Sequence, residues 1–295
     1  MTVPTAWRPL DRAFERMVPL PQPYLHVLDR IHQHLRPRCY VEIGVRDGRS
    51  MALMLPGTRG IGIDPQPKLR FPLCAGADVY PVTSDEFFAS SELTRSLLAR
   101  PVDLAFIDGM HLFEFALRDF INLERFAGPG TRILLHDCYP IDASTAARER
   151  TTDRWSGDIW KLIVCLKDQR PDLRIGVVDV APTGLGVIGG LDPTSRVLAD
   201  DYDAIVDRYR SLPYGYLEET GKADVLNRVP ADWDRIRPLL PPRPFRRGAV
   251  RLMRARRTVA RARPLARAAM RGRWRRARAR LWDTRLPGAR PQGRG

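Results

Sequence analysis

The sequence lacks several features that would place it among secreted or membrane-spanning proteins. Its four cysteines are scattered and form no Cys-x-x-Cys pair, which favours reduced thiols in a cytoplasmic protein. No hydrophobic run approaches the roughly 18 apolar residues that a membrane-spanning helix needs. Residues 1–10 also lack the basic and apolar regions of a signal peptide. We therefore expect a cytoplasmic protein.

Lysine is scarce everywhere, and acidic residues are scarce in the C-terminal part. Only four of the 49 basic residues are lysine, a bias that GC-rich coding of bacterial type produces without functional meaning. From Arg235 to the end there are 21 arginines and one acid, Asp283, a net charge of about +20. Subtracting this charge from the +15 of the whole chain leaves about −5 for residues 1–234. The charge pattern therefore indicates a mildly acidic domain that carries a strongly basic tail.

The most informative stretch is the motif Glu42-x-Gly44-x-x-x-Gly48. A short apolar segment before the glycines predicts a buried strand, the glycines predict a tight turn, and a second strand is predicted to end at Asp64. This order is typical of the first half of a nucleotide-binding α/β fold. The dinucleotide fingerprint Gly-x-Gly-x-x-Gly is absent from this turn, which argues against a nicotinamide dehydrogenase. An acid inside the first strand repels a pyrophosphate and suits a cationic or amine-bearing ligand.

Strand and helix patterns alternate along the chain as far as residue 188. Strands are predicted at 39–43, 60–64, 79–82, 102–108, 133–137, 174–180 and 185–188, and helices at 22–35, 49–55, 84–98, 112–126 and 159–166. We predict a doubly wound, mostly parallel seven-stranded sheet with a terminal antiparallel hairpin. The predicted divisions are an N-terminal helical segment (1–36), a core (37–192), a helical C-terminal extension (193–240) and an arginine-rich tail (241–295) that is helical or disordered.

Over residues 35–190 these features resemble the class I S-adenosylmethionine-dependent methyltransferases. The resemblance implies that Gly44 and Gly48 lie against the cofactor and that Asp64 binds both ribose hydroxyls. It also implies that Asp85, beside Ser84, reads the adenine amino group, although an acid in the first turn of a helix is favoured by the helix dipole alone. Glu42 is expected either to contact the methionine amino group or to hold the glycine turn in place.

A second motif, Asp108-Gly-Met-His111, is followed one strand later by His136-Asp137. Together they resemble a branch of O-methyltransferases that act on sugars and natural products. The resemblance implies that Asp108 contacts the cofactor and is catalytic, with His111 or His136 as general base.

Asp108 and Asp137, at adjacent strand ends, are also predicted to hold a divalent cation such as Mg²⁺. Cys138 stands where metal-dependent relatives usually have a further oxygen ligand, so a metal-free site remains an alternative. Another alternative is that His136 is a buried histidine bonded to a backbone carbonyl. In the loop that follows, Trp155 and Trp160 are candidates either to stack on a substrate ring or to anchor the core.

The expected acceptor is a small molecule or a glycan, and the oligomeric state is not predicted. For residues 243–282 we expect peripheral contact with an anionic membrane surface, or a disordered tail that docks an acidic partner. Nucleic acid ranks third, because no nucleic-acid-binding motif accompanies the basic run. Two alternative functions stay open. One is a nucleic-acid methyltransferase, although the Asn/Asp-Pro-Pro-aromatic motif is absent, and the other is a non-catalytic scaffold.

Overall fold

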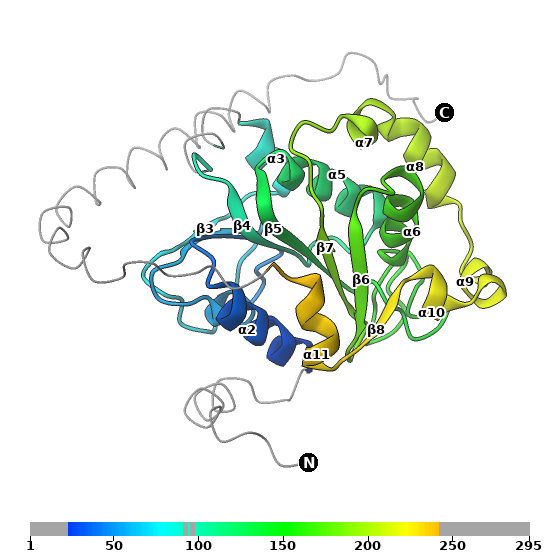
Figure 1. The fold of residues 1–295 in the computed structure, drawn as a ribbon, viewed down its shortest axis with the longest axis horizontal. Coiled ribbons are helices and arrows are strands. Elements are labelled where there is room, and N and C mark those ends of the chain that lie inside the picture. Colours follow the sequence, from blue (N-terminus) through cyan, green and yellow to red (C-terminus); the bar gives the residue numbers. More distant parts are fainter. Residues whose placement is uncertain (1–22, 91–93, 95–97, 242–295) are drawn as a thin grey trace, which may run out of the picture. The chain divides into compact units, whose positions relative to one another are not determined.

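The computed structural model describes residues 23–90, 94 and 98–241 (Figure 1). By its internal contacts the chain divides into two units, Met1–Arg243 and Pro244–Gly295, and every described residue belongs to the first. The predicted arginine-rich tail lies outside the described residues, apart from position 241, and so does most of the second half of the helix predicted at 84–98. Within the described ranges, no helix is both long and apolar enough to cross a bilayer.

A single mixed sheet forms the centre of the first unit, in the order β3-β2-β1-β4-β5-β7-β6-β8. Its strands are β1 (Cys39–Ile43), β2 (Arg59–Ile63), β3 (Ala77–Tyr80), β4 (Val102–Ile107), β5 (Ala127–His136), β6 (Arg174–Asp179), β7 (Leu185–Gly189) and β8 (Arg228–Pro230). Every neighbouring pair is parallel except the two pairs that involve β7. The predicted doubly wound, mostly parallel fold is confirmed.

The sheet has eight strands where the sequence predicted seven. The additional strand, β8, pairs in parallel with β6. The predicted hairpin of β6 and β7 therefore does not end the sheet, because β7 lies between β5 and β6 and β8 covers the outer side of β6. A strand of three residues is too short to produce a period-two hydrophobic pattern, so no pattern in the sequence indicated β8.

Helices cover both faces of the sheet (Figure 1). They are α2 (Pro23–Leu35), α3 (Ser84–Ala89), α5 (Phe113–Glu124), α6 (Trp160–Gln169), α7 (Val197–Asp200), α8 (Tyr202–Arg210), α9 (Gly215–Thr220), α10 (Lys222–Val225) and α11 (Trp233–Ile236), with 3₁₀ turns η2 (Met51–Leu53) and η3 (Arg237–Leu239). One buried cluster joins the sheet to α3, α5, α6 and α8, and a second joins it to α2, η2 and α11. Side chains on the two faces of the sheet therefore form two hydrophobic cores, as in any doubly wound sheet.

Two local predictions differ from the structure. The helix predicted at 49–55 is only the 3₁₀ turn η2, because the chain becomes extended at Met54 and returns to β2. The helix predicted at 84–98 is interrupted, because α3 begins at Ser84 as expected but ends at Ala89, with Ser90 as its C-cap. Thr83 is the N-cap and forms a reciprocal capping box with Glu86, which satisfies two backbone donors at once.

Candidate functional site

The carboxyl ends of β1, β2, β4 and β5 lie side by side at one edge of the sheet. The register pairs Ile43 with both Ile63 and Ile107, and Ile107 with Leu135. The residues after these pairs are therefore brought together, and this edge is where doubly wound sheets bind ligands. The predicted acids and histidines of β1, β2, β4 and β5 all lie in or directly after these strand ends.

The glycine turn after β1 packs against the loop that follows β4. Gly44 has a φ of 89°, and a Cβ at this position would overlap the carbonyl oxygen of Asp108. Its amide donates to the carbonyl of Ile63, 2.8 Å away, which ties the turn to β2. Gly48 also has a positive φ, of 86°. Only glycine tolerates both the positive φ and the close approach to the Asp108 carbonyl at position 44. The turn after β1 can therefore pack directly against the loop after β4.

Glu42 is fully buried beneath this turn. Its carboxylate accepts hydrogen bonds from the hydroxyls of Tyr40 and Ser50, each at 2.6 Å. Burial raises the pKa of Glu42 to about 8, although both hydroxyl donors act to lower it. A side chain with no exposed surface and a donor on each oxygen is arranged to hold the turn, which is the second of the two roles expected for it.

Asp64 follows β2 and is nearly buried. Its Oδ2 accepts from the amide of Arg46 and its Oδ1 from the amide of Gln66, both at 2.7 Å. Each carboxylate oxygen can accept a second hydrogen bond, so the group remains able to receive two ribose hydroxyls. The two amides fix the carboxylate in one orientation. This geometry fits the ribose of S-adenosylmethionine.

Ser84 and Asp85 lie at the start of α3 and are not among the residues that line the small pocket described below. The Asp85 carboxylate is about half exposed and forms a two-point ion pair with Arg118 of α5, at 3.0 and 2.8 Å. The Ser84 hydroxyl bonds to Asp119, also on α5. Both side chains therefore connect α3 to α5 in this structure, and their expected part in reading adenine stays a prediction.

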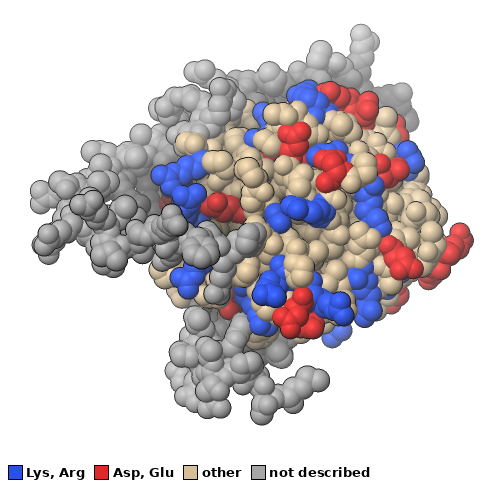
Figure 2. Space-filling view, in the orientation of Figure 1, with Lys and Arg blue, Asp and Glu red and all other residues tan. Residues whose placement is uncertain are grey.

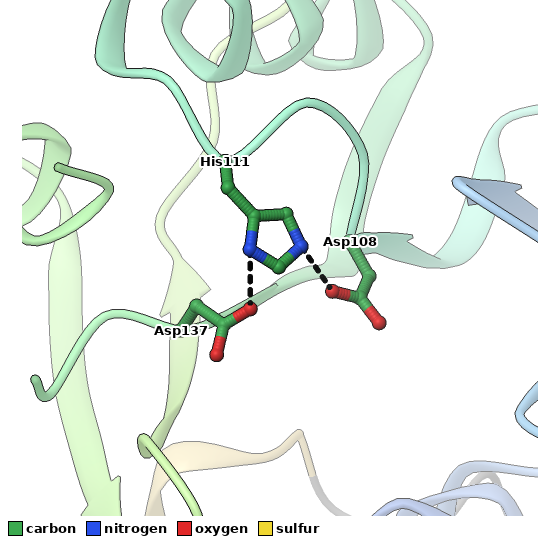
Figure 3. A group of neighbouring side chains, drawn as sticks. All are labelled: Asp108, His111 and Asp137. Atoms are coloured by element: carbon green, nitrogen blue, oxygen red, sulfur yellow. Dashed lines mark ion pairs between the residues drawn. The ribbon is translucent and has the colours of Figure 1, made fainter. Parts of the chain in front are cut away.

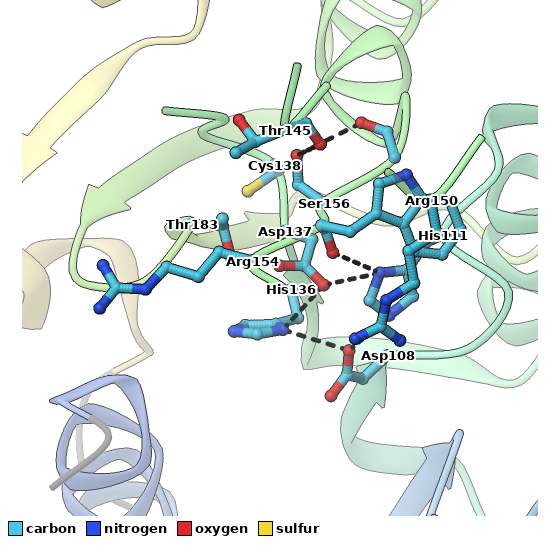
Figure 4. Close-up of polar contacts among 12 residues, drawn as sticks. Asp108, His111, His136, Asp137, Cys138, Thr145, Arg150, Arg154, Ser156 and Thr183 are labelled. Atoms are coloured by element: carbon cyan, nitrogen blue, oxygen red, sulfur yellow. Dashed lines mark hydrogen bonds and ion pairs between the residues drawn. The ribbon is translucent and has the colours of Figure 1, made fainter. Parts of the chain in front are cut away.

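Asp108, His111, His136 and Asp137 come together at the ends of β4 and β5, and we call them the four-residue cluster. His111 places Nδ1 3.1 Å from Asp137 Oδ2 and Nε2 3.4 Å from Asp108 Oδ1 (Figure 3). His136 directs its Nδ1 to the same two oxygens, at 3.1 Å from Asp108 and 3.2 Å from Asp137 (Figure 4). Each imidazole thus contacts both carboxylates.

The two histidines differ in accessibility. The His136 side chain is 8% exposed and that of His111 is 23% exposed. The second ring nitrogen of His136, Nε2, is buried and has no hydrogen-bond partner within the described ranges, and the ring packs against Tyr24 of α2 with centroids 4.1 Å apart. The partners of His136 Nδ1 are carboxylates, whereas the sequence-based alternative expected a backbone carbonyl. His111 is the imidazole that a substrate can reach.

Charge within the cluster shifts its protonation equilibria. Burial alone would lower the pKa of His136, but the charges of Asp137 and Asp108 outweigh burial and raise it to about 10. The pKa of His111 is also raised against the effect of burial, by its hydrogen bond to Asp108 and the charge of Asp137. Burial likewise opposes the shift at Asp108, where the charge of His136 and the hydrogen bonds of both histidines hold the pKa well below its usual range.

Two further residues orient the cluster. The Trp155 ring stacks on His111 at an interplanar angle of 12°, and its backbone carbonyl lies 3.2 Å from His111 Nδ1. On the other side, the hydroxyl of Thr183 donates to Asp137 Oδ1, which leaves Oδ2 facing the histidines. Trp155 is thus a support of the site, while Trp160 is fully buried in the core.

A small pocket opens between the cluster and α5. The residues that line it are Ile107, Asp108, Gly109, Met110, His111, Ala116, Asp119, His136, Asp137 and Ile159. Asp119 is 3% exposed, one of its oxygens has no hydrogen-bond partner among the residues that the structure describes, and burial raises its pKa to about 7. Sequence reasoning missed Tyr24, Asp119 and Thr183. Each is an isolated polar residue, so no motif or residue spacing in the sequence indicated that it lies at the site.

The predicted cation ligands, Asp108 and Asp137, are close enough to share an ion. One ligand atom from each, together with a nitrogen of His111, lie within 4.8 Å of one another. The set fits a divalent cation in charge and spacing. It fits Mg²⁺ less well, because Mg²⁺ prefers oxygen ligands throughout. The Cys138 thiol contacts the carbonyl of Leu135 within its own strand end, and burial raises its pKa.

Comparison with known proteins gives one family match. Residues 41–138 match the model of a family described as a methyltransferase domain. None of the curated proteins matches the chain significantly.

Among solved structures, the chain is similar to cofactor-bound Rv0187 from MTB, at 17% identity over 62% of this chain and 86% of that one, with a TM-score of 0.47. It is also similar to an O-methyltransferase from Bacillus cereus in complex with SAH, at 13% identity over 64% and 91% of the two chains and a TM-score of 0.45. A third similar structure is the O-methyltransferase TomG from Streptomyces achromogenes, involved in tomaymycin synthesis, in complex with SAM, at 13% identity over 60% and 84% and a TM-score of 0.44. Residues 41–138 are thus similar to a methyltransferase domain, and they include most of β1 and all of β2 to β5 of the doubly wound sheet.

Proposed function

We propose that this protein transfers a methyl group from S-adenosylmethionine to a hydroxyl of a sugar, glycan or secondary metabolite. The observation that carries the proposal is the convergence of Asp108, His111, His136 and Asp137 beside the glycine turn and Asp64. One part of this edge suits a ribose, and the adjoining part suits a hydroxyl that must lose a proton. The cofactor supplies an already activated methyl group. The protein therefore has only to bind the cofactor and the acceptor, align them, and deprotonate the acceptor hydroxyl.

Asp64 and the glycine turn are the residues that would hold the cofactor. Asp64 offers fixed oxygens to the two ribose hydroxyls, and Gly44 lets the backbone pass close to the ligand. Glu42 acts through its hydrogen bond from Ser50, which keeps the turn in position.

The Asp108–His111 pair is the proton acceptor that the geometry favours. The His111 side chain is the more exposed imidazole, and its contact with Asp108 would stabilise the charge that it gains. When bound, the cofactor would supply the methyl group, whose bond to sulfur would break as the acceptor oxygen bonds to the methyl carbon and would leave S-adenosylhomocysteine as the product. The Asp108–His111 pair would take the hydroxyl proton. His136, with its pKa raised to about 10, is charged at neutral pH and balances the two carboxylates.

The proposal is tested by calorimetric titration of S-adenosylmethionine and S-adenosylhomocysteine into wild type and Asp64→Ala. We expect micromolar binding to wild type and a loss of at least tenfold in the variant, because both ribose hydrogen bonds disappear. A screen of sugar and natural-product acceptors with labelled cofactor then identifies the acceptor class. A folded wild type that binds neither compound would contradict the proposal and favour the scaffold alternative.

We also propose that residues 243–282 bring the enzyme to anionic membrane surfaces, at the inner face of the membrane in a cytoplasmic setting. The support is the difference in net charge between the two parts of the sequence, about +20 for residues 235–295 and about −5 for residues 1–234. Basic and acidic side chains are interspersed on the described part of the face in Figure 2, so this face offers no comparable basic patch.

Deleting residues 243–295 should abolish sedimentation with phosphatidylserine vesicles and leave S-adenosylhomocysteine affinity unchanged. Vesicle binding that survives the deletion would contradict the membrane proposal. Tight, salt-dependent binding of RNA or DNA that the deletion removes would instead support the nucleic-acid alternative.

A further inference from the structure

We propose that Asp158 is a positioning residue for His111, the imidazole assigned as proton acceptor, and that it acts through the segment 155–158. Its effect on methyl transfer rests on the proposed function, but its effect on the position of His111 does not. Asp158 lies in the loop between β5 and α6, and its side chain is 1% exposed. Every side chain of the four-residue cluster is more exposed than this. A carboxylate buried this deeply requires charged or hydrogen-bonding partners, and those partners show what it holds in place.

The two oxygens of Asp158 have different partners. Oδ1 accepts from the backbone amide of Phe113 at 2.8 Å, and Phe113 is the first residue of α5, two residues after His111. Oδ2 lies 2.6 Å from a guanidinium nitrogen of Arg148 and 3.1 Å from Nζ of Lys161. The amide of a first helical residue has no acceptor within its own helix, so Asp158 supplies one. The bond ties the loop to the chain directly after His111.

Two neighbours of Asp158 contact His111 itself. Gly157 has a φ of 59°, and a Cβ at this position would lie 1.8 Å from the carbonyl oxygen of His111. The Trp155 ring stacks on the imidazole with the two ring centroids 5.1 Å apart, and the Trp155 carbonyl lies 3.2 Å from Nδ1. The segment 155–158 therefore contacts both the backbone and the side chain of His111.

The same segment is fixed to the beginning of its own loop. The amide and the hydroxyl of Ser156 both donate to the carbonyl of Thr145, each at 2.9 Å (Figure 4). The indole N–H of Trp155 donates to the carbonyl of Ala147 at 2.6 Å. These bonds hold the loop together locally, but none of them joins it to α5. The connection between the loop and α5 therefore depends on Asp158 and its charged neighbours.

Two carboxylates and two cations form this connection. Arg148 bonds to both oxygens of Glu114 on α5, at 2.6 and 3.0 Å, and also to Asp158. Lys161 pairs with Asp158 and donates to the carbonyl of Arg210, 2.6 Å away, at the end of α8. In Asp158→Asn the amide oxygen can still accept a backbone hydrogen bond, but the negative charge between the two cations is lost. Removing one member of a buried ionic group leaves the others uncompensated.

His111 adopts a backbone conformation that its surroundings must enforce. Its φ of 57° lies in the left-handed region, which is uncommon for residues other than glycine. Such conformations cost free energy and persist only where the surrounding contacts impose them. The segment 155–158 supplies such contacts. When this segment is loosened, we expect His111 to move away from Trp155 and from Asp108.

The chain contains a matched control at the other end of α5. Glu124 is 5% exposed, accepts from the backbone amide of Asp192 through one oxygen at 3.1 Å, and pairs with Arg170 through the other at 2.9 Å. Asp158 has the same two kinds of partner. We therefore expect Asp158→Asn and Glu124→Gln to lower the melting temperature by similar amounts. Only Asp158→Asn should disturb His111.

The test is nuclear magnetic resonance of the full chain with isotope-labelled histidine and tryptophan. Wild type and Glu124→Gln should show nuclear Overhauser cross-peaks between the rings of His111 and Trp155, and Asp158→Asn should lose most of their intensity. With the acceptor found in the screen, kcat of Asp158→Asn should fall by about 10²-fold, the usual cost of a misplaced catalytic group. The KM for S-adenosylmethionine should stay within a few-fold of wild type, and Glu124→Gln should keep near wild-type kcat.

A milder variant keeps the test decisive if Asp158→Asn does not fold. Arg148→Lys retains the positive charge but cannot form the two-point pair with Glu114, so it should weaken the same cross-peaks. The inference is overturned by cross-peaks that are absent from wild type, that persist in the folded variant, or that weaken equally in Glu124→Gln. Equal losses of kcat in Asp158→Asn and Glu124→Gln would also overturn it. A protein that binds S-adenosylhomocysteine while the cross-peaks persist refutes this inference alone. Cross-peaks lost in a protein that binds no S-adenosylhomocysteine would support it and refute the proposed function.

Discussion

The β1–β2 half of the strand-end edge and the β4–β5 half both carry buried acids, but they satisfy them differently. In the first half, Glu42 receives two hydroxyl donors and Asp64 receives two backbone amides, all of them neutral. In the second half, Asp108 and Asp137 face two imidazoles whose pKa values are raised. The first half is arranged to hold a polar ligand in a fixed position, and the second is arranged to exchange charge.

The backbone is strained in both halves. Positive φ values occur at Gly44, Arg46 and Gly48 in the first half and at His111 and Asp137 in the second. In the second half the residues with this conformation are themselves members of the four-residue cluster. Because the side chains that exchange charge belong to the second half, we infer that methyl transfer depends more sharply on it than on the first.

The largest expected effect is at Asp108. Asp108→Asn removes the negative charge that stabilises a protonated His111, so turnover should fall by about 10²–10⁴-fold, the usual size of a general acid–base contribution. S-Adenosylhomocysteine affinity should stay within a few-fold of wild type. The rate is measured by transfer of labelled methyl to the acceptor found in the screen. Equal losses of binding and turnover would remove the distinction between the two halves.

Glu42 offers a test of the first half through pH. Its folded-state pKa of about 8 lies above its usual value of 4.5, so the folded protein holds the proton more tightly. Stability from this group is fully present below pH 4.5 and is lost as pH rises to about 8. Since one unit of pKa corresponds to about 1.4 kcal/mol, the loss is a few kcal/mol.

Glu42→Gln should remove this pH dependence. Its amide oxygen can accept from one of the two hydroxyls, Tyr40 or Ser50, while its NH₂ group donates to the other. Urea denaturation of both proteins at pH 5, 7 and 8.5 measures the pH dependence. If the difference in stability between them stays constant across the three pH values, the assigned pKa of Glu42 is wrong.

The smallest effect is expected at Asp85. Its ion pair with Arg118 is about half exposed, and such pairs contribute about 1 kcal/mol or less. Asp85→Asn should therefore change the free energy of unfolding very little and alter S-adenosylhomocysteine affinity by no more than a few-fold. A loss of affinity as large as that of Asp64→Ala would mean that the Asp85 side chain moves away from Arg118 and contacts the adenine when the cofactor binds.

The sequence predicted the parts of this site that depend on strand ends, and missed those that depend on packing between distant segments. Asp64, Asp108 and His136 could be placed because parallel strands bring their carboxyl ends together. Tyr24 and Thr183 were missed because they reach the cluster from α2 and from the β6–β7 turn, and no periodicity records such contacts. The eighth strand was missed for a related reason, since three residues paired with β6 show no alternating pattern.

The most direct test of the account is a side-by-side titration of S-adenosylhomocysteine into Asp64→Asn and Asp108→Asn. Both changes replace one carboxylate oxygen with an amide at neighbouring strand ends, so each serves as the control for the other. We predict at least a tenfold loss of affinity in Asp64→Asn and near wild-type affinity in Asp108→Asn. Losses of the same size in both variants, or in neither, would contradict the division of this edge into a cofactor half and a transfer half.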